Sequence, residues 1–134
     1  MYFLIYRSQA TQPVTEQMLK EILAQSRRRN PGMGITGMLL FFDNKFMQLL
    51  EGEESEVKLL YKDICADSRH TEVVTLREGP VLGRLFPEWS MSFRSLSPKE
   101  VAAEPAYKDV YTPGSPGAHD LHSLFNLLRG KTAG

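Results

Sequence analysis

Two polar side chains, Tyr6 and Gln48, lie within segments that are otherwise apolar, and together they could exchange hydrogen bonds with a ligand. Gln48 falls between Phe46 and Leu50 on one face of an apolar run. A buried amide costs stability there unless its donors and acceptors are matched. Each polar residue alone is most simply a satisfied group of the core. If their two segments are neighbouring strands, however, the pair becomes a candidate for binding a ligand.

Cationic side chains gather where two predicted helices end. Arg27, Arg28 and Arg29 close the first helix, and we interpret them as cations that complement the helix macrodipole. Arg69 and His70 come directly after the second helix. The two helix ends could therefore form a rim for an anionic ligand held between them.

Other sequence patterns argue against a dinucleotide-binding motif, a metal site and an enzyme active site. Residues 32–37 match the dinucleotide-binding string G-x-G-x-x-G, but they leave a helix and enter a strand, which is the reverse of that motif. We therefore expect these glycines to serve a tight turn and close backbone packing. His119 and His122 lack further metal ligands, so no metal site is predicted. Because no nucleophile lies beside a base and no carboxylates pair in an apolar setting, we expect a protein that is not an enzyme.

The elements that must position these residues can be predicted from hydrophobic periodicity. Two amphipathic helices separate runs of strand character. The first helix begins after a Thr15 N-cap and ends at Asn30 and Pro31. The expected strands cover residues 2–8, 35–42, 46–50, 73–76 and 89–94, and the second helix lies within 53–64. This βαββαββ order predicts an α+β fold, a ferredoxin-like mixed sheet with both helices on one face.

The C-terminal part of the chain forms a second region in this scheme. We expect a main domain at residues 1–96, followed at residues 97–134 by a linker and a helix. A narrow apolar stripe formed by Leu121, Leu124, Phe125 and Leu128 suits a helix that docks on the open face of the sheet or on a partner.

Composition limits the classes of partner. The chain has 134 residues, enough for one domain with a real core, and its 16 basic and 16 acidic side chains give a net charge of zero. No global field favours nucleic acid or an anionic membrane, so we expect neither as a partner. The single Cys65 excludes an internal disulfide. No apolar stretch approaches the ~20 residues of a membrane helix, and the expected compartment is the cytoplasm.

Taken together, the motifs are similar to those of the BLUF family, the flavin-binding sensors of blue light. The resemblance covers about residues 1–95 in order and with family-like spacing. It rests on Ile5-Tyr6-Arg7-Ser8, Ser26 with Arg29-Asn30, Gly34-Ile35-Thr36-Gly37, Phe46 to Gly52, Asp67-Ser68-Arg69-His70 and Trp89-Ser90-Met91.

The resemblance implies an oxidised flavin bound between the two helices, usually FAD, with FMN and riboflavin as alternatives. Tyr6 corresponds to the photochemical tyrosine of the family, Gln48 to its switching glutamine, and Asn30 to an asparagine that pairs with the pyrimidine edge of the flavin. Arg69 corresponds to an arginine near the flavin and its phosphates. The full set of expected cofactor-binding residues is Tyr6, Ser26, Arg29, Asn30, Gln48, Arg69 and His70.

The resemblance also implies how a signal would form. Blue light drives electron and proton transfer from Tyr6 to the flavin, and Gln48 then rearranges its hydrogen bonds. Trp89 and Met91 on the last strand pass the change to the C-terminal helix. We expect a downstream protein partner and a homo-oligomer.

Two other functions remain open from the sequence. One is a small acylphosphatase-like hydrolase on the same fold, which would need a phosphate-cradling loop after the first strand; residues 8–12 contain no glycine for it. The other is an interaction module without photochemistry. Retention of Tyr6, Asn30 and Gln48 argues against that module.

Overall fold

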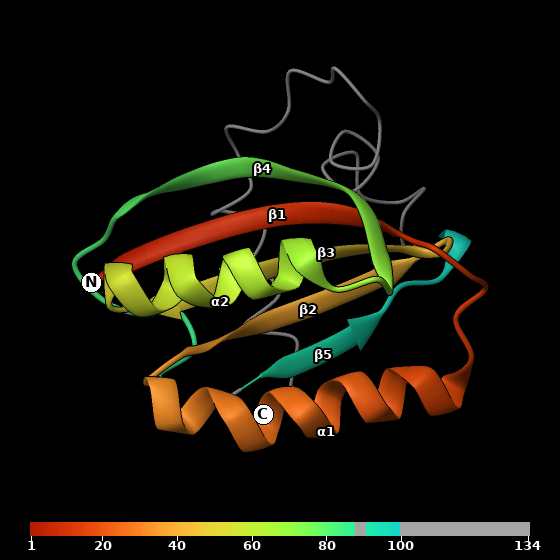
Figure 1. The fold of residues 1–134 in the computed structure, drawn as a ribbon, viewed down its shortest axis with the longest axis horizontal. Helices are drawn as coiled ribbons and strands as arrows, with labels where there is room; N and C mark the ends of the chain where they lie inside the picture. Colours follow the sequence, from red (N-terminus) through yellow and green to blue (C-terminus); the bar gives the residue numbers. More distant parts are fainter. Residues whose placement is uncertain (88–90, 100–134) are drawn as a thin grey trace.

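A computed structural model describes residues 1–87 and 91–99 of the chain. The order of its helices and strands is the predicted βαββαββ order (Figure 1). The elements are β1 Tyr2–Ala10, α1 Glu16–Met33, β2 Thr36–Phe42, β3 Lys45–Gly52, α2 Glu54–Ala66, β4 His70–Pro80 and β5 Ser92–Ser95. The α+β class is therefore confirmed.

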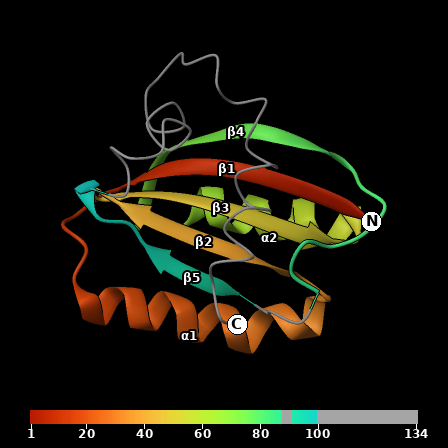
Figure 2. The same ribbon diagram turned by 180° about the vertical axis from the view of Figure 1, so that it is seen from behind.

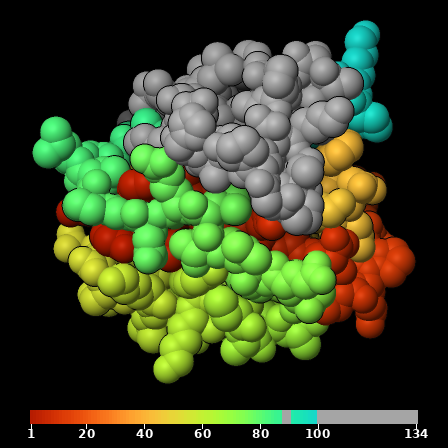
Figure 3. Space-filling model, turned by 90° about the horizontal axis from the view of Figure 1, so that it is seen from above, coloured from red at the N-terminus to blue at the C-terminus, as the bar shows by residue number. Residues whose placement is uncertain are grey.

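The strands form one mixed sheet in the order β4-β1-β3-β2-β5 (Figures 1 and 2). β1 pairs antiparallel with both β3 and β4, so it is a central strand, as its apolar character on both faces predicts. β5 pairs in parallel with β2 and extends the sheet on that side. In the view from above, α2 and β4 form much of the coloured part of the surface, with parts of β1 between them (Figure 3).

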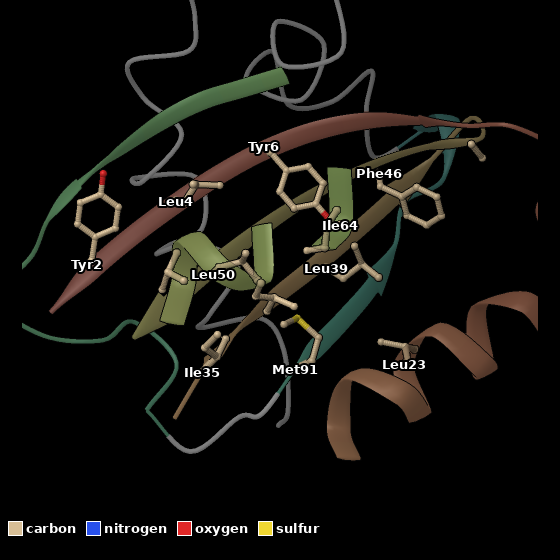
Figure 4. Packing of buried hydrophobic residues seen from close by; sticks show 13 residues of the cluster. Tyr2, Leu4, Tyr6, Leu23, Ile35, Leu39, Phe46, Leu50, Ile64 and Met91 are labelled. Carbon is tan, nitrogen blue, oxygen red and sulfur yellow. The ribbon is translucent and has the colours of Figure 1, made fainter. Parts of the chain in front are cut away.

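Alternation along the strands produces one apolar cluster on each face of the sheet. The helix-face cluster joins side chains of β1 and β3 to Leu23 of α1 and to Leu60 and Ile64 of α2 (Figure 4). Both helices therefore pack on the same face, as predicted. The opposite-face cluster contains Phe3, Ile5, Met38, Leu40, Met47, Leu49, Phe86 and Leu96.

Helix α1 begins as predicted but ends later. The Thr15 hydroxyl accepts the backbone N–H of Met18, which confirms the N-cap. The prediction that Asn30 and Pro31 end the helix is wrong, because the helix continues to Met33. Its last turn is closed by Gly34, whose φ of 66° is left-handed and whose N–H donates to the Pro31 carbonyl, while Ile35 N–H donates to the Asn30 carbonyl. This Schellman arrangement offsets the hydrogen bond that Pro31 cannot donate.

The later end of α1 also corrects the interpretation of its arginines. The last turn of the helix contains no basic residue, so Arg27 to Arg29 lie too far from the C-terminus to complement the macrodipole strongly.

The glycines of residues 32–37 serve the backbone, as expected. A Cβ at Gly37 would lie 1.9 Å from the carbonyl oxygen of Leu49 on the paired strand β3. At the other end of the hairpin, Asp43 and Asn44 both have positive φ, the conformation of a tight two-residue turn. The β2–β3 hairpin therefore depends on close backbone contact at one end and on turn chemistry at the other.

The last two strands differ from their predicted bounds. β4 extends from His70 to Pro80, well beyond the predicted residues 73–76, because its pairing with β1 continues through polar residues that show no apolar alternation. β5 begins at Ser92, so Met91 lies just before the strand. Trp89 and the expected C-terminal helix lie outside the described residues. Neither described helix is long and apolar enough to span a membrane.

Candidate binding site between the helices

The Tyr6 and Gln48 side chains meet at the centre of the sheet. They are directly opposite residues in the β1–β3 register, so both point to the helix face. The Tyr6 hydroxyl donates a hydrogen bond to Oε1 of Gln48. Gln48 Nε2 in turn donates to the Sδ of Met91, 3.3 Å away. The amide is therefore held at its acceptor end by a phenol and at its donor end by a thioether.

Burial keeps the phenol of Tyr6 protonated. Tyr6 is 1% exposed, and its desolvation raises the pKa of the phenol far above the ordinary value. The Tyr6 hydroxyl is thus neutral over the whole physiological range and acts as a hydrogen-bond donor to Gln48. A neutral phenol in this position can supply both a proton and an electron to an acceptor.

A pocket of about 250 Å³ opens beside this pair, between the two helices. Its apolar walls come from Ile22 of α1, Leu39 and Phe46 of the sheet and Ile64 of α2. The residues predicted for the site that line it are Tyr6, Ser26, Arg29, Gln48, Arg69 and His70. The pocket therefore gathers residues from distant parts of the chain.

Arg69 is held in place by neighbouring side chains. Its Nε lies 3.0 Å from both carboxylate oxygens of Asp67, and its Nη2 donates to Oε1 of Gln25 at 3.0 Å. These hydrogen bonds lower the pKa of Asp67 and raise that of Arg69. Both groups are therefore charged at neutral pH, and the arginine is fixed at the edge of the pocket.

Arg29 and Asn30 adjoin the pocket from α1. Arg29 lines it, and its Nε donates to Oδ1 of Asn30 at 3.4 Å. Burial lowers the pKa of Arg29. Asn30 itself is fully buried and does not line the pocket. The structure thus places Asn30 next to the site and connects it to the pocket through Arg29.

Ser26 and His70 are engaged by protein partners. The Ser26 hydroxyl donates to the carbonyl of Ile22 within α1. His70 Nδ1 lies 3.0 Å from the Ser8 hydroxyl, and the His70 ring packs edge-on against Phe46. Burial lowers the pKa of His70, so the imidazole is neutral near pH 7.

Several residues that line the pocket were not among the predicted cofactor-binding residues. Asp63, Asp67 and Gln25 also line the pocket. The ion pair between Asp67 and Arg69 could have been predicted, because a carboxylate stands only two positions before the arginine. Arg27, interpreted as a helix-end cation, instead donates from Nε to the carbonyl oxygen of Met91 at 3.1 Å. No local pattern could have shown that contact.

The pocket has the features that a flavin ring requires. Four apolar side chains form part of its wall, and among the described residues the Nε2 of Gln48 donates to a thioether, which is a weak acceptor. Small-molecule sites combine such apolar walls with a few convergent polar groups. A planar ring edged by hydrogen-bonding atoms fits this donor set.

Comparison with known proteins gives the same result. The family model for BLUF, sensors of blue light using FAD, matches residues 1–92. Photoactivated adenylate cyclase subunit beta of Euglena longa is 39% identical over 108 residues, which are 80% of this chain and 12% of that protein. The blue light- and temperature-regulated antirepressor BluF of Escherichia coli (strain K12) is 42% identical over 73 residues, or 54% of this chain and 18% of the relative. The chain thus spans a small fraction of these curated relatives.

Solved structures agree with the sequence comparisons. The dark-state structure of the BLUF protein BlrB has a TM-score of 0.82 and 32% identity, covering 97% of this chain and 96% of that one. The photo-activated state of BlsA has a TM-score of 0.80 and 27% identity, covering 96% and 94% of the two chains. These matches favour the photoreceptor interpretation over a hydrolase or a module without photochemistry.

Proposed function

Since the chain belongs to the BLUF family and is a blue-light photoreceptor domain that uses a flavin, we propose that Tyr6 and Gln48 form its light-driven switch. The observation that carries this proposal is the buried hydrogen bond between the Tyr6 hydroxyl and Gln48 Oε1, at the floor of the pocket. The pair combines a neutral donor with an amide that has two chemically different ends. Both residues lie on paired inner strands of the sheet, β1 and β3, so their side chains can change while the backbone stays in place.

The flavin would be held by Ser26, Arg29, Asn30, Arg69 and His70 together with the switch pair. Bound in the pocket, the flavin supplies absorption of blue light and an acceptor for an electron and a proton. Ile22 of α1 and Ile64 of α2 would pack apolar side chains against it. Arg69 contributes positive charge at the edge of the pocket, where Asp67 and Gln25 orient the guanidinium. FAD is the expected cofactor, and FMN would fill the same pocket.

In this mechanism Tyr6 releases an electron and the proton on its Oη and then takes both back. Gln48 loses the donor that holds its Oε1 while the phenol is deprotonated, and its amide is free to reorient. After reorientation Nε2 faces Tyr6, and Oε1 faces the Sδ of Met91 in place of the N–H. The protein before and after illumination then has the same covalent structure, and the two states differ only in the hydrogen bonds of Gln48.

We further propose that Met91 carries this difference outward. It adjoins β5, which pairs with β2 at the side of the sheet. Trp89 would act with Met91, and residues 97–134 would carry the signal from a domain at residues 1–96 to a protein partner. The names of the Euglena relatives, photoactivated adenylate cyclases, indicate that such domains regulate effectors. The domain itself would act in the cytoplasm as a sensor and not as a catalyst, within a homo-oligomer and without contacting nucleic acid.

Absorption spectra test this mechanism. The purified protein should be yellow, shift slightly to the red under blue light and revert in darkness. Gln48→Leu and Tyr6→Phe should each keep the flavin and lose the shift. Tyr2→Phe is the matched control, since Tyr2 lies on the same face of β1, and it should retain the shift. A normal shift in Gln48→Leu would refute the switch, and a colourless protein after reconstitution with FAD would refute flavin binding.

A further inference from the structure

Met91 is fixed at two points by residues that lie far away in the sequence. Its Sδ accepts from Gln48 Nε2 at 3.3 Å, and its carbonyl oxygen accepts from Arg27 Nε at 3.1 Å. The side chain is 2% exposed and belongs to the helix-face cluster. The same residue therefore connects the buried amide of the switch to helix α1.

The chain reaches Met91 from the other side of the sheet. The backbone N–H groups of Leu85 and Phe86 donate to the carboxyl oxygens of Glu51, and Phe86 packs in the opposite-face cluster. Phe86 and Met91 therefore lie on opposite faces of the sheet. On the helix face, Arg27 binds the backbone at Met91.

We propose that Arg27 is a positioning residue of the switch, which holds Met91 so that its sulfur stays within reach of the Gln48 amide. This inference rests on the proposed function of Gln48. A thioether is a weak acceptor, so its contact with an N–H contributes little unless another interaction fixes the sulfur in place. The guanidinium provides that interaction through the backbone, and it leaves the Met91 side chain itself free to respond to the amide.

The proposal predicts a kinetic effect of Arg27→Ala. Once Gln48 has reoriented, its return in darkness restores the N–H contact with the Met91 sulfur. If Arg27 no longer holds Met91 in place, dark recovery should slow roughly twofold to tenfold, the range that the loss of one hydrogen bond produces. Arg28→Ala is the matched control, because Arg28 is also exposed on α1 and the change in helix propensity is the same. It should recover at the rate of the unmodified protein.

A double-mutant cycle separates positioning from a general structural role. Met91→Leu removes the sulfur but keeps the backbone carbonyl that Arg27 binds. If Arg27 acts through the sulfur, Arg27→Ala should have no further effect on recovery in the Met91→Leu background. Equal slowing in both backgrounds would overturn the proposal, as would equal slowing by Arg28→Ala.

A second measurement does not depend on photochemistry. In protein labelled with ¹³C at the methionine methyl groups, the Met91 signal is assigned by its disappearance in Met91→Leu. Arg27→Ala should move or broaden this signal in the dark, and Arg28→Ala should not. An unchanged Met91 signal in Arg27→Ala would refute the positioning role. If the signal changes but no variant responds to light, the proposed function fails and the Arg27 contact stands.

Discussion

Replacing Glu51 by glutamine tests how the segment that leads to Met91 is anchored. Glu51 is fully buried on β3, three residues from Gln48 but on the opposite face. Its Oε2 accepts from the backbone N–H of Leu85 at 2.6 Å, and its Oε1 from that of Phe86 at 2.9 Å. Glutamine has the same shape but only one oxygen, so its NH₂ group would face one of these two N–H donors.

The size of the effect follows from that mismatch. One buried N–H loses its acceptor, which costs about 1–3 kcal/mol. For a domain of this size, unfolding in urea has an m-value of about 1–3 kcal/mol per molar. The urea midpoint of Glu51→Gln should therefore fall by about 1 M. Since the two donors belong to Leu85 and Phe86, one of those amides should also exchange its hydrogen faster.

A second glutamate provides the matched control for charge. Glu53 is exposed and makes no capping hydrogen bond through its side chain, although it is the N-cap of α2. Glu53→Gln should change stability by less than about 0.5 kcal/mol. Equal midpoints for the two variants, with unchanged exchange at Leu85 and Phe86, would refute the anchoring argument.

Two further predictions concern backbone packing and pH. Gly37→Ala places a Cβ 1.9 Å from the Leu49 carbonyl oxygen, so β2 and β3 cannot pair as they do here; we expect little folded protein by circular dichroism, and a native-like spectrum would contradict this. Burial lowers the pKa of His70 below that of the unfolded chain, so the unfolded state binds more protons and stability falls as pH drops from 7 towards 5. His70→Gln should lose less stability over that interval in urea titrations, and parallel curves would show that His70 makes no contribution.

Much of the fold could be predicted because local patterns and pairing agree. The neighbouring positions of Tyr6 and Gln48 followed from the predicted ferredoxin-like sheet, which places their two strands side by side. The Thr15 N-cap followed from a hydroxyl placed just before an amphipathic run. In these cases the residue type and its position in the hydrophobic pattern are sufficient to predict the structure.

The features that could not be predicted depend on contacts distant in sequence. The extension of α1 through Pro31 requires the closing hydrogen bonds at Gly34 and Ile35, which are visible only once the backbone is placed. The full length of β4 depends on its pairing with β1, because its own residues are largely polar. Arg27 resembled its neighbours Arg28 and Arg29 in sequence, and only the arrival of Met91 beside α1 distinguishes it.

The charges that line the pocket have a consequence for how a ligand enters it. Arg29 and Arg69 are balanced by Asp63 and Asp67, and His70 is neutral. The lining therefore carries no net charge, and we expect little of the electrostatic steering that accelerates the encounter of opposite charges. The association rate of an anionic flavin should be nearly independent of ionic strength. Its capture would then be governed by diffusion and by the fit of the ring against the pocket lining.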